Sequence, residues 1–257
     1  MTTPLKKLMI RTWRGPLPPW TPQFLKSVEP LKEFGWHFLL MENWDWFRVM
    51  CQVVLDVQIP PEIDTRKPGD YDPALGDIFS RHHPEADWFK QFDFWGHFNL
   101  DCVYGRLSHF LPDSFLANID IYGNDPGAVC GPFTVYRNCE KVNRLYRRIL
   151  GWEHDFASPE FKGWDEGRFS AGVRNWALSG DIRFASGFLQ AHDHMTPQHC
   201  DMAQMYGNPS THLTLDRAIS PVSWVPESSG SPALIDNVTG QEIMMYHFNQ
   251  TRRWPVG

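Results

Sequence analysis

The order of apolar and polar positions predicts a parallel strand–helix–strand unit at the start of the chain. Residues 7–12 predict a first strand, and a loop rich in Gly and Pro follows it. Residues 20–31 then carry apolar side chains at helical spacing after a Thr-Pro start. A second apolar run at residues 36–41 predicts a buried strand. Because a helix separates the two strands, the unit is typical of a parallel sheet.

Further strands and helices are predicted along the rest of the chain. The expected elements are a helix over residues 43–54, a Pro-rich loop over 59–72, a helix over 73–82 with Asp72 as its N-cap, strands over 92–98, 102–104, 115–122 and 131–136, a helix over 142–150 and a last strand over 242–248. Residues 184–197 are expected to be irregular, and residues 209–232 to form a loop. The chain shows no internal repeat and no clear linker, so we expect one α/β domain over residues 1–257.

The composition narrows the class of protein. Hydrophobic residues make up 42% of the chain and charged residues 21%, which is typical of a globular protein and not of a disordered one. The aromatic share is high, with 12 Trp and 18 Phe, and most of these rings are expected in the core. The net charge of −6 argues against a nucleic-acid partner, although a few local cations would suffice to bind a nucleotide.

The ends of the chain and the cysteines suggest a location. The apolar run at the N-terminus stops at Arg11, which is too short for a signal peptide. No segment reaches the roughly 18–20 apolar residues that span a bilayer, so no integral membrane segment is expected. The five cysteines are odd in number and form no CxxC pair. A reduced, cytoplasmic setting is the simplest interpretation.

One candidate metal motif follows an apolar strand. Asn99 and Asp101 lie two residues apart, so both side chains can point to the same side of an extended segment. Two oxygen ligands at this spacing can face one Mg²⁺ or Mn²⁺ ion, which can bridge the phosphates of a nucleotide. The alternative is a simple turn between two strands, and the triplet alone favours that alternative.

Two further segments carry charge at predicted helix starts. Lys67 and Asp70 belong to a stretch of cations, carboxylates and small residues, which would let a helix lie close to a ligand or to a neighbouring strand. Asp165 and Glu166 are adjacent acids beside Trp164, and they could supply a catalytic carboxylate or bind sugar hydroxyls. For both segments the alternative is a solvated helix start, where acids favour the helix dipole.

Histidines near the C-terminus offer other candidates. His247 ends the last predicted strand and precedes Arg252 and Arg253. Imidazole is a common metal ligand, and paired arginines bind phosphate oxygens. The alternative is a basic tail with a packed histidine. A separate cluster is a weaker candidate for a zinc site because its spacing matches no standard motif: it consists of His192, His194 and His199.

In this order, the segments resemble the small GT-A-type glycosyltransferase-like proteins of bacteria and large DNA viruses, catalogued largely as a domain of unknown function. The resemblance covers most of residues 7–170 and the C-terminal end, and it is weak over residues 171–240. The matching stretches, in chain order, are residues 18–27, 70–76, 93–105, 131–138 and 164–166, and His247 with its basic stretch. Any one of them is non-specific, but six in the same order are hard to obtain by chance.

The resemblance implies a GT-A-like fold with a mixed, mainly parallel central sheet flanked by helices. It also implies a nucleotide-diphosphate-sugar donor, Mn²⁺ or Mg²⁺, and a glycan or other hydroxyl acceptor. On the matching positions, the metal ligands would be Asp101 and His247, and the acceptor would face Asp165 and Glu166. The donor-binding residues would be Thr12, Trp13, Lys67, Asp70, Asn99, Arg252 and Arg253. Trp164 would stack on a sugar.

The chain departs from the family pattern at three positions. Asn99 replaces the first acid of the metal motif, Asp72 replaces a Lys, and Leu75 replaces a Tyr. An amide can still accept a hydrogen bond or coordinate through its carbonyl oxygen. The departures motivate an alternative function, a non-catalytic carbohydrate-binding protein on a degenerate glycosyltransferase fold.

Overall fold

A mixed six-stranded sheet forms the centre of the computed structural model. The structure describes residues 3–82, 85–125, 127–129, 131–187, 222–225, 233–236, 242 and 244–247. The strand order is β2-β1-β3-β6-β5-β7. The strands are β1 (Lys7–Thr12), β2 (Trp36–Met41), β3 (Phe94–Phe98), β5 (Ile121–Gly123), β6 (Phe133–Arg137) and β7 (Phe184–Ser186). Strand β1 is parallel to β2 and β3, and β7 is parallel to β5, whereas β6 runs antiparallel to both of its neighbours.

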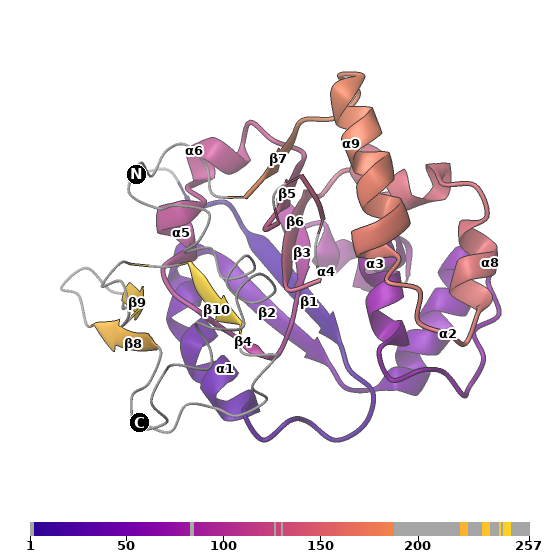
Figure 1. Ribbon diagram of the computed structural model, residues 1–257, viewed down its shortest axis with the longest axis horizontal. Helices are drawn as coiled ribbons and strands as arrows, with labels where there is room; N and C mark the ends of the chain where they lie inside the picture. The colour runs from indigo at the N-terminus through magenta and orange to yellow at the C-terminus, as the bar shows by residue number, and fades with distance from the viewer. Residues whose placement is uncertain are drawn as a thin grey trace, which may run out of the picture.

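Helices cover both faces of this sheet (Figure 1). On one side lie α1 (Thr21–Val28), α5 (Leu107–Phe110) and α6 (Asp113–Leu116); on the other lie α2 (Trp44–Leu55), α3 (Leu75–Arg81), α8 (Trp152–Ala157) and α9 (Ser170–Leu178). The other described helices are η1 (Glu29–Phe34), η2 (Lys67–Ala74), α4 (Glu85–Phe89), α7 (Glu140–Asn143), η3 (Leu145–Arg148) and the π-helical turn η4 (Asp165–Phe169).

Alternate residues of the central strands enter two separate cores. Leu8 and Ile10 of β1 pack with Trp95 in the core under α2 and α3. Met9, between them, packs with Phe24 of α1 in the other core. Since residues 8–10 of β1 are buried on both faces, all three are apolar, and this run indicates the strand in the sequence. The mixed α/β architecture predicted from the sequence is confirmed.

Two small sheets flank the central one. Strand β4 (Cys102–Tyr104) pairs antiparallel with β10 (Met245–His247), and β8 (Val222–Val225) pairs with β9 (Ala233–Asp236). Figure 1 shows β10, in yellow, beside β4 and close to α1. This pairing brings the C-terminal part of the chain to the segment that directly follows β3.

Several predicted elements have different limits in the structure. The helix predicted over residues 20–31 ends at Val28, and the chain continues as η1, because Pro30 has no N–H to donate to the preceding turn. The strand predicted over residues 115–122 is wrong before Ile121, where β5 begins, and its first two residues belong to α6. The predicted N-cap at Asp72 is also wrong, since Ala74 precedes α3. β7 lies in a segment predicted to be irregular, and β8 in a predicted loop.

None of the helices in the described ranges is long and apolar enough to cross a membrane.

Candidate functional site

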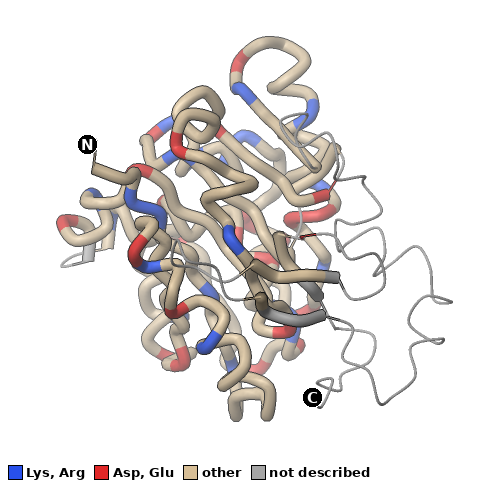
Figure 2. The backbone as a smooth tube through the Cα atoms, turned by 90° about the vertical axis from the view of Figure 1, so that its left-hand side faces the viewer, with Lys and Arg blue, Asp and Glu red and all other residues tan. Residues whose placement is uncertain are grey.

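Buried charges single out one region of the protein. Figure 2 shows positively and negatively charged residues interspersed along the described backbone. Residues of opposite charge can therefore pair at the surface. Ionised side chains are almost never fully buried unless they are paired or bound to a ligand. The described Lys and Asp side chains that are buried are Lys7, Lys67, Asp70, Asp72, Asp77 and Asp165. Half of them lie in η2 and one begins η4, so most of these buried charged side chains belong to two segments.

The segment η2 and the start of α3 lie directly against the sheet because small residues allow it. A Cβ atom added to Gly76 would lie 2.4 Å from the ring of Trp95 in β3. The Tyr71 hydroxyl donates a hydrogen bond of 2.8 Å to the carbonyl oxygen of Phe156, which fixes η2 from its other side. The prediction that the small residues let this helix approach a neighbouring strand is therefore confirmed.

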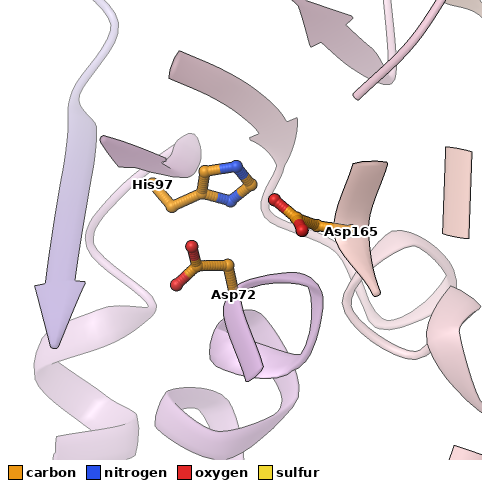
Figure 3. A group of neighbouring side chains, drawn as sticks. All are labelled: Asp72, His97 and Asp165. Atoms are coloured by element: carbon orange, nitrogen blue, oxygen red, sulfur yellow. The ribbon is translucent and has the colours of Figure 1, made fainter. Parts of the chain in front are cut away.

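Three side chains from separate elements meet at this position (Figure 3). His97 belongs to β3, Asp72 to η2 and Asp165 to η4. One carboxylate oxygen of each aspartate and one ring nitrogen of the histidine lie within 4.8 Å of one another. All three residues are buried. We call them the Asp-His-Asp cluster.

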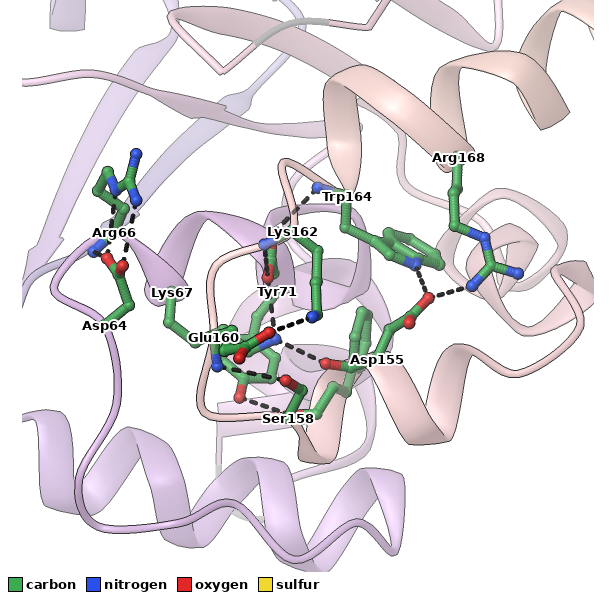
Figure 4. A network of polar contacts seen from close by, with 12 residues as sticks. Asp64, Arg66, Lys67, Tyr71, Asp155, Ser158, Glu160, Lys162, Trp164 and Arg168 are labelled. Carbon is green, nitrogen blue, oxygen red and sulfur yellow. Dashed lines mark hydrogen bonds and ion pairs between the residues drawn. The ribbon is translucent and has the colours of Figure 1, made fainter.

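Lys67 and Asp70 hold the chain segment that leads to Asp165 (Figure 4). Lys67 Nζ donates to Asp70 Oδ2 at 2.9 Å and to the carbonyl oxygen of Asp155 at 2.6 Å. Asp70 also accepts hydrogen bonds of 2.9 Å from the backbone N–H groups of Lys162 and Trp164. Both Lys67 and Asp70 are fully buried, and each makes more than one of these contacts. Their geometry assigns them a positioning role, and donor binding by them stays a prediction.

One arginine is paired with the cluster. Arg11 Nη1, at the end of β1, lies 3.2 Å from Asp72 Oδ2. Burial nevertheless raises the pKa of Asp72 to about 7, because the lowering effect of Arg11 is smaller than the loss of solvation. Burial raises the pKa of Asp165 well above its ordinary value, and the negative charges of Asp72 and Glu166 add to this shift. Two carboxyl groups thus share an environment that resists their ionisation.

These shifts predict a pH-dependent stability. Between the ordinary value of 3.8 and about 7, the folded protein keeps a proton on Asp72 that the unfolded chain has released. We therefore expect the free energy of unfolding to fall as the pH rises through this window, and we expect Asp72→Asn to make the fall shallower. Urea unfolding at a series of pH values, with EDTA in the buffer, measures both profiles.

The control for this prediction is Asp45→Asn, since the Asp45 side chain is 86% exposed. This variant should keep the pH profile of the wild type. A profile for Asp72→Asn as steep as that of the wild type would contradict the prediction.

Asn99 and the two acids converge on Gly131. The Gly131 N–H donates to Glu166 Oε1 at 3.4 Å. A Cβ atom added to Gly131 would lie 3.5 Å from Asp165 Oδ2, 3.5 Å from Glu166 Oε1 and 3.9 Å from Asn99 Nδ2. Glu166 is exposed, whereas Asp165 is buried. The alternative in which both acids form a solvated helix start is therefore wrong for Asp165.

The two predicted metal ligands lie on paired segments. Asp101 is half-buried and directly precedes β4. In the antiparallel pair of β4 and β10, His247 is opposite Cys102, the residue after Asp101. The side chain of His247 lies outside the described part of the chain, as do Arg252 and Arg253. The His192, His194 and His199 cluster also lies outside the described residues.

Aromatic and hydroxyl residues near the first loop complete the predicted set. Thr12 is buried, and its Oγ1 has no hydrogen-bond partner among the described residues. Trp13 is half-buried and donates from Nε1 to the Pro16 carbonyl oxygen at 3.0 Å. Trp164 is only 1% exposed and stacks on Phe169, so the prediction that it stacks on a sugar is wrong.

The sequence prediction gave no functional role to Arg11, Asp72 or His97. The sequence predicts Asp72 as a helix cap and marks it as a departure from the resembled pattern, and it places His97 inside the matching stretch 93–105. A signal for His97 exists in the sequence: it stands inside an apolar strand, where an imidazole needs a polar partner. No local pattern pairs Arg11 with Asp72, which lies about sixty residues further along the chain.

Comparison with known proteins gives a family. No curated protein and no solved structure matches the chain. One family model matches residues 9–190, which is well over half of the chain and includes every site residue from Arg11 to Glu166. The domain of unknown function expected from the sequence is thus confirmed, and the chain belongs to the family of unknown function DUF6625.

Proposed function

We propose that the protein is a metal-dependent glycosyltransferase that moves a sugar from a nucleotide-diphosphate sugar to a glycan or other hydroxyl acceptor. The observation that carries the proposal is the position of the Asn99–Asp101 segment. Its first residue meets Glu166 at Gly131, and its last residue lies next to the β4–β10 pair that contains His247. One short segment therefore has a candidate acceptor carboxylate near its first residue and a candidate cation ligand at its last.

The chemistry of sugar transfer suits these residues. A nucleoside diphosphate leaves with negative charge, which a divalent cation and arginines can stabilise. Asp101 and His247 would hold Mn²⁺ or Mg²⁺, and Arg252 and Arg253 would contact the phosphates. The cation would supply charge stabilisation to the leaving group.

Asp165 and Glu166 would have different roles at the acceptor. Glu166 is exposed and can take the proton of the acceptor hydroxyl if the reaction inverts the sugar. Asp165 is buried, and the loop that leads to it is fixed by Asp70, so it orients the site from within. The GT-A form of the α/β fold, the sugar acceptor and a cytoplasmic location are parts of the same proposal.

Nucleotide binding tests the proposal. We expect isothermal titration with UDP or GDP to show binding that requires Mn²⁺, because the cation bridges the phosphates and the protein. Asp101→Ala should weaken this binding by at least about tenfold. Asp45→Ala, which removes an exposed carboxylate, is the control and should bind as the wild type does. If the wild-type protein binds neither nucleotide in the presence of Mn²⁺, the proposal fails.

A carbohydrate-binding protein without catalysis is the second candidate. It is favoured by the amide of Asn99 at the position of the first acid and by the Asp72–Arg11 pair, in which Asp72 stands where the family has a Lys. This candidate predicts glycan binding without consumption of nucleotide sugars. Hydrolysis of any nucleotide-diphosphate sugar that is lost in His247→Ala would exclude it.

A further inference from the structure

The Asp-His-Asp cluster has the composition of a metal site of its own. Asp72, His97 and Asp165 are 0%, 0% and 3% exposed, and their ligand atoms lie within 4.8 Å of one another. Figure 3 shows the two carboxylates turned toward the imidazole from different elements. Polar groups of this kind are costly to bury, and two acids with an imidazole do not gather through apolar packing. Apolar packing therefore does not explain why these three side chains lie together.

The charges of the cluster leave a carboxylate oxygen available. Arg11 contacts Asp72 through Oδ2 and offsets one negative charge. Asp72 Oδ1 is buried and, among the described residues, has no hydrogen-bond partner. Buried carboxylates in proteins are paired or coordinate a metal. Burial raises the pKa of both carboxyl groups, and the negative charges around Asp165 add to its shift.

The cluster lies close to solvent at its Asp165 end. An added Cβ atom at Gly131 would make only ordinary contact with Asp165 Oδ2, at 3.5 Å. The next residue, Glu166, is exposed, so the cluster is buried but lies one residue from solvent.

We propose that Asp72, His97 and Asp165 bind a divalent transition-metal ion at a site separate from the one that Asp101 and His247 would form. The imidazole favours Zn²⁺ over Mg²⁺ and Ca²⁺, which prefer sets made of oxygen alone. Three protein ligands leave a further coordination position open for water or another small ligand. The ion would supply the positive charge that the cluster needs in addition to that of Arg11. This inference does not rest on the proposed transferase activity.

Zinc titration of the full chain tests the site. The protein is stripped with a chelator and titrated with ZnCl₂ in the absence of nucleotide. We expect the wild type to bind Zn²⁺, and Asp72→Asn and Asp165→Asn each to lower the affinity at least about tenfold. Zinc should also raise the melting temperature of the wild type, and raise it less in both variants.

Matched controls separate this site from other candidates. Glu166→Gln removes the neighbouring exposed acid and should keep the zinc affinity of the wild type. Asp101→Ala should also keep it, so a failure of the nucleotide experiment is distinguished from a failure here. The double variant His192→Gln/His194→Gln should bind as the wild type does. Loss of zinc binding in that double variant, with retention in Asp72→Asn, would overturn the proposal.

Two other results would overturn it. One is the absence of zinc binding by the wild type. The other is wild-type affinity in both Asp72→Asn and Asp165→Asn. If circular dichroism shows that these variants do not fold, the decisive measurement is made on the wild type by NMR of its histidine rings. The resonances of His97, assigned with His97→Gln or by through-bond correlation, must then shift with one equivalent of Zn²⁺, and unchanged resonances would refute the site.

Discussion

Replacing Asp70 by Ala is expected to lower the free energy of unfolding by about 3–5 kcal/mol. The substitution leaves the fully buried ammonium group of Lys67 without its carboxylate. It also removes the acceptor for the N–H groups of Lys162 and Trp164, and the Trp164 N–H would remain buried without that partner. Urea unfolding followed by circular dichroism measures the loss.

Two variants make this prediction specific. Asp64→Ala breaks a similar pair with Arg66, only a few residues away, but that pair is largely exposed and its loss should leave the stability close to that of the wild type. The double variant Lys67→Met/Asp70→Leu removes both buried charges and should be more stable than Asp70→Ala alone. Equal losses for Asp64→Ala and Asp70→Ala would contradict the importance that we assign to burial.

Replacing Gly76 by Ala is expected to cost about 1–3 kcal/mol, because the added methyl group would overlap the indole of Trp95. That ring cannot move freely. It stacks on Tyr136 at a centroid distance of 4.2 Å, and its Nε1 donates to Asn143 Oδ1 at 2.7 Å. Urea unfolding gives the cost, and near-ultraviolet circular dichroism reports any displacement of the indole.

Gly69→Ala is the matched control for the glycine prediction. Gly69 lies in the adjacent segment η2, and a Cβ atom there would be 3.7 Å from the ring of Phe161, an ordinary contact. This variant should unfold at nearly the urea concentration of the wild type. If Gly76→Ala is as stable as Gly69→Ala, α3 does not lie against the sheet as closely as described.

The central strands could be predicted because their buried apolar residues lie next to one another in the sequence. Residues 8–10 and most of residues 36–41 are apolar, and the structure has strands with the predicted limits 7–12 and 36–41. The error at residues 115–122 has a tertiary cause. Asp113, at the start of α6, accepts a hydrogen bond from the N–H of Leu5 and pairs with Lys7, residues more than a hundred positions away. No local pattern contains that contact.

The candidate site was predicted in part for the same reason. The sequence predicts that the adjacent acids Asp165 and Glu166 are functional, but it does not predict that one is buried and the other exposed. Asp165 lies inward because Asp70 accepts a hydrogen bond from the backbone N–H of Trp164. The Asp-His-Asp cluster was missed because its members come from three elements whose meeting depends on the complete packing. Asp72 looked like a helix cap, since a helix start and a buried 3-10 turn share the same residue types.

Because β10 pairs with β4, the central sheet can form before the proposed donor site is complete. Every strand of the central sheet lies between residues 7 and 186, so a growing chain on the ribosome can assemble the sheet before β10 has been synthesised. β10 must then close a loop of about 140 residues to reach β4, a contact of very high sequence separation that is slow to form. The order of synthesis therefore delays His247 until the site residues between Arg11 and Glu166 have been made, and catalysis of the proposed kind would begin only after this last strand has paired.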